Sequence, residues 1–448
     1  MTKQKGLFDK FIQILTHSID PVPKNLDHYE IVIVGDILGG ILTHNLTKFT
    51  HGHKDIMYVT KSKNFEMNCL RPLYEQKRLN KLDYFILPVL AVNRSIAQPV
   101  DPSIKSIDPV KNKIHFENGR EITYSTLVLD NELKYDISKI EGFTAALNDP
   151  EIPVFSTIES ENLKKYYKSF SLFHSGNAVV TIPKFPFQGE TEMYNFLMAL
   201  DYFTEGEKTG LVSPQHKLII LNENDRFCSY SDKLNEMIVR RLSSNPKVEV
   251  IYGAELNKID GEERKAFYKT KEGNMAELEF SYIYVHPPTK SNSLLGKAGI
   301  LEKNENMIRV DQKTLQHKKF ENIFSFGSGI DLPQQPSFLG SVRQGHVVRH
   351  NTLQMINGRT PNAHYNGDLD LNLFTGISSL VNYSVRSGQE QLKEGWFNEQ
   401  LQYKLMIQSG IKKFTKIYTS KKAGPPSRGY QKFPDGSPVS ANAEKATN

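Results

Sequence analysis

Cysteine is rare in this chain of 448 residues, which contains Cys69, Cys228 and no other. The two residues are far apart in the sequence, and neither belongs to a C-x-x-C pair. Disulfide frameworks and cysteine-only zinc sites require paired or clustered cysteines, so the sequence excludes both. A chain with so little cysteine is compatible with a reducing compartment.

Long hydrophobic runs are also missing, because no stretch approaches the roughly 20 apolar residues of a membrane-spanning helix. The sequence contains no P-loop, no G-x-S-x-G elbow and no H-E-x-x-H helix, which argues against the enzyme classes that depend on them. His346 and His350 have the spacing of two metal ligands on one helix face, but no third ligand can be placed beside them. We therefore expect no metal site.

The positive charge of the chain is concentrated in its C-terminal segment. Residues 404–448 carry nine Lys and Arg residues against Asp435 and Glu444, so this segment is +7 and the remaining chain is −1 of the total of +6. The basic charge belongs to a terminal tail and not to a nucleic-acid-binding face of the protein, so we predict no binding of nucleic acid. A solvated extension, or one that lies on acidic lipid or an acidic protein, explains the charge better.

The first 18 residues have the pattern of a short amphipathic helix, in which Lys3, Lys5 and Lys10 alternate with apolar side chains. Mitochondrial targeting segments have this character, although the segment contains Asp9 and no arginine. The other interpretation is an ordinary helix that packs on the body of the protein or on a neighbour. The sequence leaves both open.

A dinucleotide-binding unit begins at Tyr29 but lacks part of its fingerprint. The β-branched run Glu30-Ile31-Val32-Ile33-Val34 leads into a glycine turn and an amphipathic helix, as in a Rossmann unit. Gly35 and Gly40 fill the first and third glycine positions of G-x-G-x-x-G, whereas Ile37 fills the second, where the backbone must approach a pyrophosphate. We expect the Ile37 side chain to occupy that space and Asp36 to add an unfavourable charge.

Strand-like and helix-like segments alternate along the chain. This alternation predicts an α/β fold with parallel sheets. Asn118-Gly119 predicts a hairpin turn between two of the strands. The expected strands are 55–60, 113–117, 122–129, 178–182, 217–221, 248–252 and 279–286, and the expected helices include 160–170, 189–204 and 231–243.

Several motifs together resemble the sulfide:quinone oxidoreductases of the mitochondrial type, in the two-dinucleotide-domain flavoprotein superfamily. The most specific stretch begins with Tyr284-Val285-His286-Pro287-Pro288. It continues through Ile308 to Phe320, which includes Thr314-Leu315-Gln316-His317, and ends in Glu321 to Ser328 and Asp331-Leu332-Pro333. The resemblance runs from about Tyr29 to about Gly376.

This resemblance implies two Rossmann-like domains of the FAD/NAD(P)-binding type, the first of them split in sequence, and a C-terminal helical or extended region. The expected boundaries are 1–27 for an N-terminal amphipathic extension, 28–145 with 320–360 for a degenerate FAD-binding-type domain, 146–319 for a second Rossmann-like domain, 361–420 for a membrane- or partner-facing region, and 421–448 for a basic extended tail.

The resemblance implies four features that hold FAD, and each is altered here. Ile37 stands at the second glycine, and Thr60 replaces the acidic ribose ligand. Asp130-Asn131-Glu132 replaces a small A-x-G turn, and Ser328 replaces the aspartate of a Gly-Asp pair. We therefore expect no bound cofactor, with Gly35, Ile37, Gly40, Thr60, Asp130 and Ser328 as the degenerate positions.

The family chemistry implies two cysteines near the flavin, one nucleophilic and one its disulfide partner. The first is expected just after Pro186, where this chain has Gln188-Gly189, and the second at the position of Leu371. Neither Cys69 nor Cys228 falls at these places. We predict no catalytic residue, and a packed role for Cys228 on a connection between a strand and a helix.

The segment from Trp396 to Tyr418 keeps a helical period of apolar residues, with lysines along its border. In the family that the chain resembles, this region forms amphipathic helices that enter one membrane leaflet. Here it could do the same, dock on a neighbouring subunit, or pack back on its own body.

Taken together, the motifs predict a pseudoenzyme descended from FAD-dependent oxidoreductases. We expect a structural or accessory subunit of a complex of the mitochondrial inner membrane, either of the respiratory chain or ATP synthase, with other subunits as partners and peripheral membrane contact. The alternative is an active FAD-dependent, quinone-reducing enzyme without the cysteine pair. A third possibility is a binding module whose altered cleft takes another nucleotide or a lipid.

Overall fold

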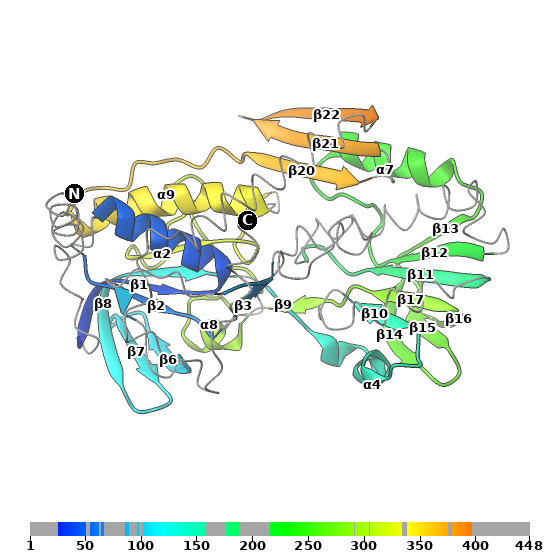
Figure 1. Cartoon of the computed structure of the whole chain (residues 1–448), viewed down its shortest axis with the longest axis horizontal. Coiled ribbons are helices and arrows are strands. Elements are labelled where there is room, and N and C mark those ends of the chain that lie inside the picture. Colours follow the sequence, from blue (N-terminus) through cyan, green and yellow to red (C-terminus); the bar gives the residue numbers. More distant parts are fainter. Residues whose placement is uncertain are drawn as a thin grey trace, which may run out of the picture.

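The computed structural model describes most of the two central domains. The described residues are 26–50, 54–61, 64–66, 86–88, 96–97, 102–131, 133–156, 175–187, 216–290, 292–303, 305–333, 338–374, 379–386 and 388–396. Two α/β bodies lie side by side, and a three-stranded sheet lies along one side of them (Figure 1). The expected segments 1–18, 160–170, 189–204, 397–418 and 421–448 lie outside the described residues.

The first body is built on a mixed sheet with the order β5-β2-β1-β8-β7-β6, in which β19 also pairs with β8. The pairings among β5, β2, β1, β8 and β19 are parallel, and β6, β7 and β8 pair antiparallel. The strands are β1 (His28–Val34), β2 (Ile56–Val59), β5 (Ile96–Ala97), β6 (Ile104–Asp108), β7 (Lys113–Phe116), β8 (Glu121–Asp130) and β19 (Ile323–Phe326).

Two helices cover one face of this sheet, α2 (Ile37–Thr50) and α9 (Phe338–Ile356), and they also contact each other (Figure 1). The apolar face of α2 buries Leu38, Leu42 and Leu46 in the first core. Buried Thr43 and Thr47 donate their hydroxyls to carbonyl oxygens one turn back, so their polar groups are satisfied within the helix. The amphipathic helix that the sequence predicts after Gly35 is thus confirmed.

The second body is a five-stranded parallel sheet with the order β10-β17-β11-β12-β13. Alternate residues of β11 face opposite sides, so that Ala178 and Val180 pack toward α7 (Asp232–Ser243) and Val179 packs toward α4 (Phe143–Asn148). The other strands are β10 (Val154–Ser156), β11 (Gly176–Ile182), β12 (His216–Asn222), β13 (Val248–Tyr252) and β17 (Tyr282–Val285).

A small antiparallel sheet adds to the α4 side of the second body. Its strands β14 (Glu255–Asp260), β15 (Lys265–Lys269) and β16 (Met275–Glu279) contribute Ile259, Ala266 and Tyr268 to the same core as α4. The expected strand 279–286 is therefore divided, because residue 279 ends β16 and the parallel strand begins at Tyr282. The other described strands and the helix 231–243 agree with expectation to within about two residues.

The chain crosses between the two bodies at one narrow place. β9 (Lys134–Tyr135) leaves the first body and pairs antiparallel with β18 (Thr289–Lys290), which returns to it. The Lys290 ammonium contacts the Asp136 carboxylate at 2.7 Å, and the Asp136 amide donates to the Pro288 carbonyl. The second body is thus inserted into the first, which places β19 beside β8.

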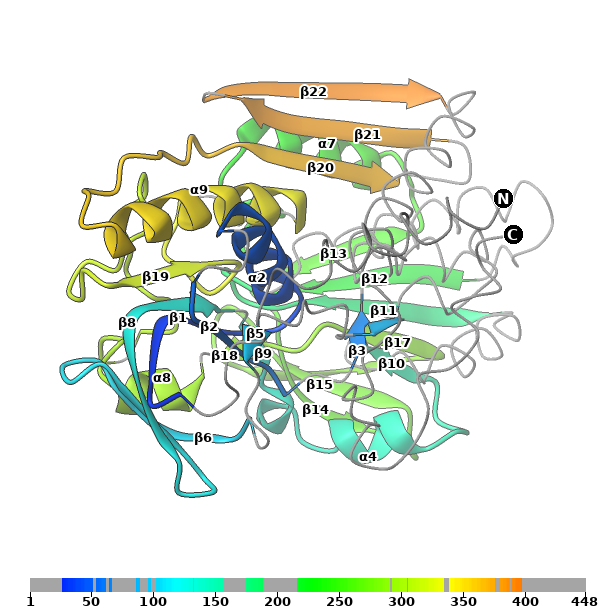
Figure 2. The same ribbon diagram turned by 60° about the vertical axis from the view of Figure 1, so that its left-hand side comes forward.

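The third sheet consists of β20 (Leu369–Phe374), β21 (Ser379–Arg386) and β22 (Gln389–Trp396), in antiparallel order. This sheet lies alongside α7 (Figure 2). Leu371, Val381 and Tyr383 belong to the same hydrophobic cluster as the buried residues of α7, and Glu394 pairs with Arg240. The sequence analysis did not predict these strands. Residues 369–396 therefore pack back on the body of the protein, whereas the three interpretations concern Trp396 to Tyr418, which lies outside the described residues apart from Trp396.

The predicted hairpin at Asn118-Gly119 is confirmed between β7 and β8. Gly119 has φ +83°, a conformation that favours glycine, and the Arg120 amide donates to the Asn118 side chain. Among the described residues, no helix has the length and apolar character needed to span a membrane.

His317, within the motif that carries the resemblance, has a structural role. Its Nδ1 accepts hydrogen bonds from the Lys319 and Phe320 amides, and its Nε2 lies 2.9 Å from the Ile300 carbonyl oxygen. These partners require a neutral ring that carries its hydrogen on Nε2. Burial lowers the pKa of His317 below its usual value, so the folded state favours the neutral form.

We predict that His317 makes the stability of the first body depend on pH. Because its folded pKa is depressed, its contribution is complete above the usual histidine pKa of about 6.5 and is lost as the pH falls through the folded pKa. His317→Asn keeps an acceptor for the two amides but does not titrate. Urea unfolding between pH 8 and pH 5 should show a smaller loss of stability for this variant than for the wild type. Equal losses would contradict the prediction.

Candidate functional site: the dinucleotide cleft

The first strand of the fold delivers the chain to the N-terminus of α2, where Rossmann folds bind the pyrophosphate of a dinucleotide. Gly35 follows β1, and a Cβ atom there would lie 2.2 Å from the Cβ of Asp130. A Cβ atom on Gly39 would lie 3.3 Å from the Tyr58 ring and 3.4 Å from the Asp130 Cβ. Both glycines allow a close approach of the end of β8 to the beginning of α2.

The Asp130 carboxylate lies at the N-terminus of α2. Its Oδ2 accepts a hydrogen bond of 3.0 Å from the Asp36 amide and one of 2.8 Å from the Gly39 amide. Asp130 is only 7% exposed. The first amides of a helix have no partner within the helix, and the helix dipole favours a negative group beside them. Asp130 therefore supplies both the acceptor and the charge that the helix terminus requires.

The residue at the expected ribose position contacts the glycine turn. The Thr60 hydroxyl donates to the Asp36 carboxylate at 2.8 Å, and the Tyr58 hydroxyl donates to the Asp36 carbonyl at 2.6 Å. Burial, and after it the charge of Asp130, raises the pKa of Tyr58, so this hydroxyl remains a donor. Asp36 is therefore held from the second strand of the sheet.

The turn after β8 is closed against the turn after β19. The Asn131 side chain donates to the Gly329 carbonyl at 2.8 Å, and the Gly329 amide donates to the Asn131 carbonyl at 2.7 Å. A Cβ atom on Gly329 would lie 2.2 Å from the Asn131 Nδ2. Ser328 accepts a hydrogen bond of 3.4 Å from the Leu133 amide. The two turns that approach the flavin in the resembled family therefore contact each other here.

The hydrogen bonds and charges at the N-terminus of α2 do not fit a bound dinucleotide. A pyrophosphate would need the α2 amides that Asp130 already engages, and it would lie against two carboxylates. The expectation for Ile37 needs a correction, because its side chain is 6% exposed and packs in the first core instead of filling the phosphate position. The group at the helix terminus is Asp130.

One of the two positions where the family has cysteines lies in a described core, and the other lies outside the described residues. Leu371 is 1% exposed on β20 and belongs to the same hydrophobic cluster as Phe187, the residue before Gln188. Gln188, Gly189 and Cys69 lie outside the described residues. Cys228 is fully buried in this cluster, on the connection between β12 and α7, so its predicted packed position is confirmed.

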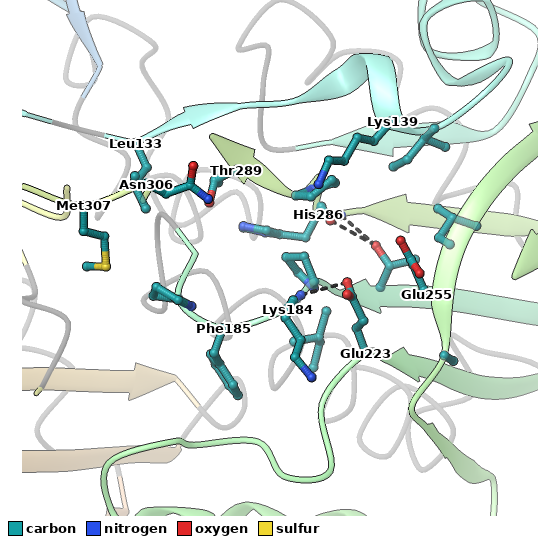
Figure 3. A pocket seen from close by; sticks show the side chains of 18 of the residues that line it. Leu133, Lys139, Lys184, Phe185, Glu223, Glu255, His286, Thr289, Asn306 and Met307 are labelled. Carbon is teal, nitrogen blue, oxygen red and sulfur yellow. Dashed lines mark hydrogen bonds between the residues drawn. The ribbon is translucent and has the colours of Figure 1, made fainter. Parts of the chain in front are cut away.

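A cavity of about 510 Å³ lies where the two bodies meet, at the carboxyl ends of β11 and β12 (Figure 3). The charged side chains around it are Lys139, Lys184, Glu223, Glu255, Glu305 and Asp331. Glu223 accepts a hydrogen bond from the Lys184 amide, and burial raises the pKa of its carboxyl group. The sequence analysis did not identify this cavity, because its lining comes from separate loops.

His286, from the motif Tyr284 to Pro288, lies on the wall of this cavity (Figure 3). It is 6% exposed and makes edge contacts with the rings of Tyr135 and Phe187. Its backbone amide donates a hydrogen bond of 2.9 Å to the Thr181 hydroxyl. The arrangement fixes β17 against β11, and the described lining residues include no thiol.

The pair His346 and His350 lies on α9 as expected, but His350 contacts the Asn362 side chain at 2.8 Å. Within the part of the chain that the structure describes, no group of three or more potential ligands could hold a metal ion.

Comparison with known proteins gives relatives of two kinds. No protein-family model matches the chain. The mitochondrial sulfide:quinone oxidoreductase of Schizosaccharomyces pombe is 29% identical over 62% of this chain and 60% of its own length, so that match spans less than two thirds of the relative. The mitochondrial sulfide:quinone oxidoreductase of Mus musculus is 24% identical over 84% of this chain and 83% of its own length.

Solved structures extend this comparison. A chain in the cryo-EM structure of the Tetrahymena thermophila mitochondrial ATP synthase is 31% identical, with a TM-score of 0.83, and the match covers 91% of this chain and 100% of that one. The sulfide:quinone oxidoreductase of Aquifex aeolicus shares the fold with a TM-score of 0.69 at 19% identity, over 88% of this chain and 92% of that one. The chain is therefore related over nearly its whole length to a chain of the Tetrahymena mitochondrial ATP synthase structure, and it is similar to the mitochondrial sulfide:quinone oxidoreductases.

Proposed function

We propose that this protein is a non-catalytic accessory subunit of a mitochondrial ATP synthase. The observation that carries the proposal is the similarity of 31% identity to a chain in the Tetrahymena thermophila mitochondrial ATP synthase structure, which the match covers completely. The match includes the whole length of that relative, so the two chains share their fold over that length. The mitochondrial sulfide:quinone oxidoreductases are more distant, at 24–29% identity.

The cleft supports a non-catalytic role. Sulfide oxidation in the manner of the family requires two thiols near a flavin, and Leu371 is a buried core residue at one of their positions. The α2 amides donate to Asp130, which leaves a pyrophosphate without its donors. The proposed subunit therefore binds no FAD and contributes shape and surface to its complex.

The location that follows from this proposal is the mitochondrial inner membrane, with the protein attached peripherally. The basic segment 404–448 and the apolar period from Trp396 to Tyr418 supply the contacts with other subunits or with acidic lipid. The polar outer residues of β22, such as Gln391 and Lys393, keep the described part of the C-terminal region compatible with an aqueous surface.

The first test is an absorbance spectrum of the natively purified protein between about 350 and 500 nm, where a bound flavin cofactor absorbs. We expect no flavin band, no flavin released by acid, and migration with ATP synthase subunits in a native gel. A stoichiometric flavin band would instead favour the active quinone-reducing enzyme. Flavin-free protein that migrates alone would contradict the subunit assignment.

Ile37→Gly tests whether the missing fingerprint glycine accounts for the absence of FAD. The variant should still bind no FAD, because Asp130 continues to engage the α2 amides. It should also lose about 3–5 kcal/mol of stability, since it removes a buried side chain from the first core. The control Ile37→Val should lose only about 0.5–1.5 kcal/mol. Recovery of stoichiometric FAD in Ile37→Gly would show that the single glycine decides binding.

A further inference from the structure

We infer that the Asp130 carboxylate is an internal replacement for the anion that dinucleotide-binding folds hold at this helix, and that it makes the fold independent of a bound cofactor. The inference deepens the proposed function and rests on it, because it explains how a subunit without FAD keeps the architecture of a flavoprotein. The inference assigns a stabilising contact to Asp130 and does not only state that a ligand is lost.

The first step of the argument is the position of the carboxylate. Asp36 and Gly39 donate their amides to the same oxygen of Asp130, whereas the Gly40 amide already donates to the Asp36 carbonyl as the first bond within the helix. Asp130 thus serves amides from the segment where a helix has no internal acceptors. A pyrophosphate in a Rossmann unit engages amides of the same terminus.

The second step is that the sheet holds Asp130 in place. Asp130 is the last residue of β8 and is paired with Phe326 of β19, and the preceding residue, Leu129, is paired with Val34 of β1. The carboxylate is therefore delivered from a strand that is fixed on both sides, more than 90 residues away from the helix that it caps. Because strand pairing already fixes the backbone at Asp130, the contact requires only that one short side chain be ordered, and it needs no ligand.

The third step is that neighbouring residues hold the turn toward Asp130. Tyr58 and Thr60 hold the carbonyl and the carboxylate of Asp36, whose amide donates to Asp130. Gly35 leaves the space into which the Asp130 side chain fits. Two of the altered positions of the FAD fingerprint, Thr60 and Asp130, are therefore joined through Asp36 in one network, with Asp130 in the place of the phosphate.

The inference predicts that Asp130→Ala lowers the stability of the full chain and uncovers an anion site. Loss of a buried cap should lower Tm by roughly 3–8 °C. Because the Asp36 carboxylate would repel an anion at the uncovered amides, the second readout uses Asp36→Asn/Asp130→Ala. Millimolar inorganic pyrophosphate should raise the Tm of this double variant by roughly 2–5 °C.

Two matched controls separate an uncovered site from a general salt effect. Asp36→Asn alone, measured in pyrophosphate and in chloride of equal ionic strength, should show no specific rise in Tm. Asp311 also accepts two backbone amides, from Lys313 and Thr314, but lies outside the cleft. Asp311→Ala should therefore lose stability without specific stabilisation by pyrophosphate.

Two outcomes would overturn the inference. The first is a Tm of Asp130→Ala that lies within about 1 °C of the wild-type Tm. The second is a rise in Tm with pyrophosphate that is equal for Asp36→Asn and for Asp36→Asn/Asp130→Ala. If Asp130→Ala does not fold, Asp130→Asn is measured, since it changes the charge and not the shape. A lower Tm then supports the inference, and an unchanged Tm overturns it. The Tm of the isolated chain depends on neither flavin nor other subunits. A failure of the inference about Asp130 is therefore distinguishable from a failure of the proposed function.

Discussion

The contact between the Asp130 carboxylate and the N-terminus of α2 joins parts of the first body that lie more than 90 residues apart in the sequence. It ties the helix after β1 to the end of β8, and β8 in turn pairs with β1, β7 and β19. In a Rossmann unit this junction is where the sheet, the helix and the ligand meet. Here the junction is made entirely by the chain, and the placement of α2 over the first core depends on it.

Much of the fold could be predicted from local patterns, because β-branched runs and glycine turns act over a few residues. The strand from His28 to Val34, the helix after it and the hairpin at Gly119 are of this kind. The Asp130 contact could not be predicted, since it joins residues more than 90 positions apart and depends on strand register. Ile37 was misplaced for a related reason: the direction of a side chain in the first helical turn is set by the helix phase, and that phase turns it into the core.

The strands from Leu369 to Trp396 were missed although Leu369-Asp370-Leu371-Asn372-Leu373 has the alternation of apolar and polar residues that is typical of a half-buried strand, because the resemblance led us to expect a helical or extended region there. Their inner face packs on α7 in the core that also contains Leu371 and Cys228. A leucine at a position where the family has a reactive thiol is thus a packing residue between two layers. The segment that would carry chemistry in a flavoenzyme instead attaches the third sheet to the second body.

Loss of a cofactor removes binding free energy from a fold, and a ligand present at 1,000 times its Kd contributes about 4 kcal/mol. A buried cap contributes about 1–2 kcal/mol, and a buried isoleucine in place of a glycine adds about 3–5 kcal/mol. Asp130 and Ile37 together are therefore of the right size to offset that loss. In the proposed subunit, the two residues that most clearly depart from a dinucleotide fingerprint are thus the ones whose contacts would stabilise the fold without a cofactor.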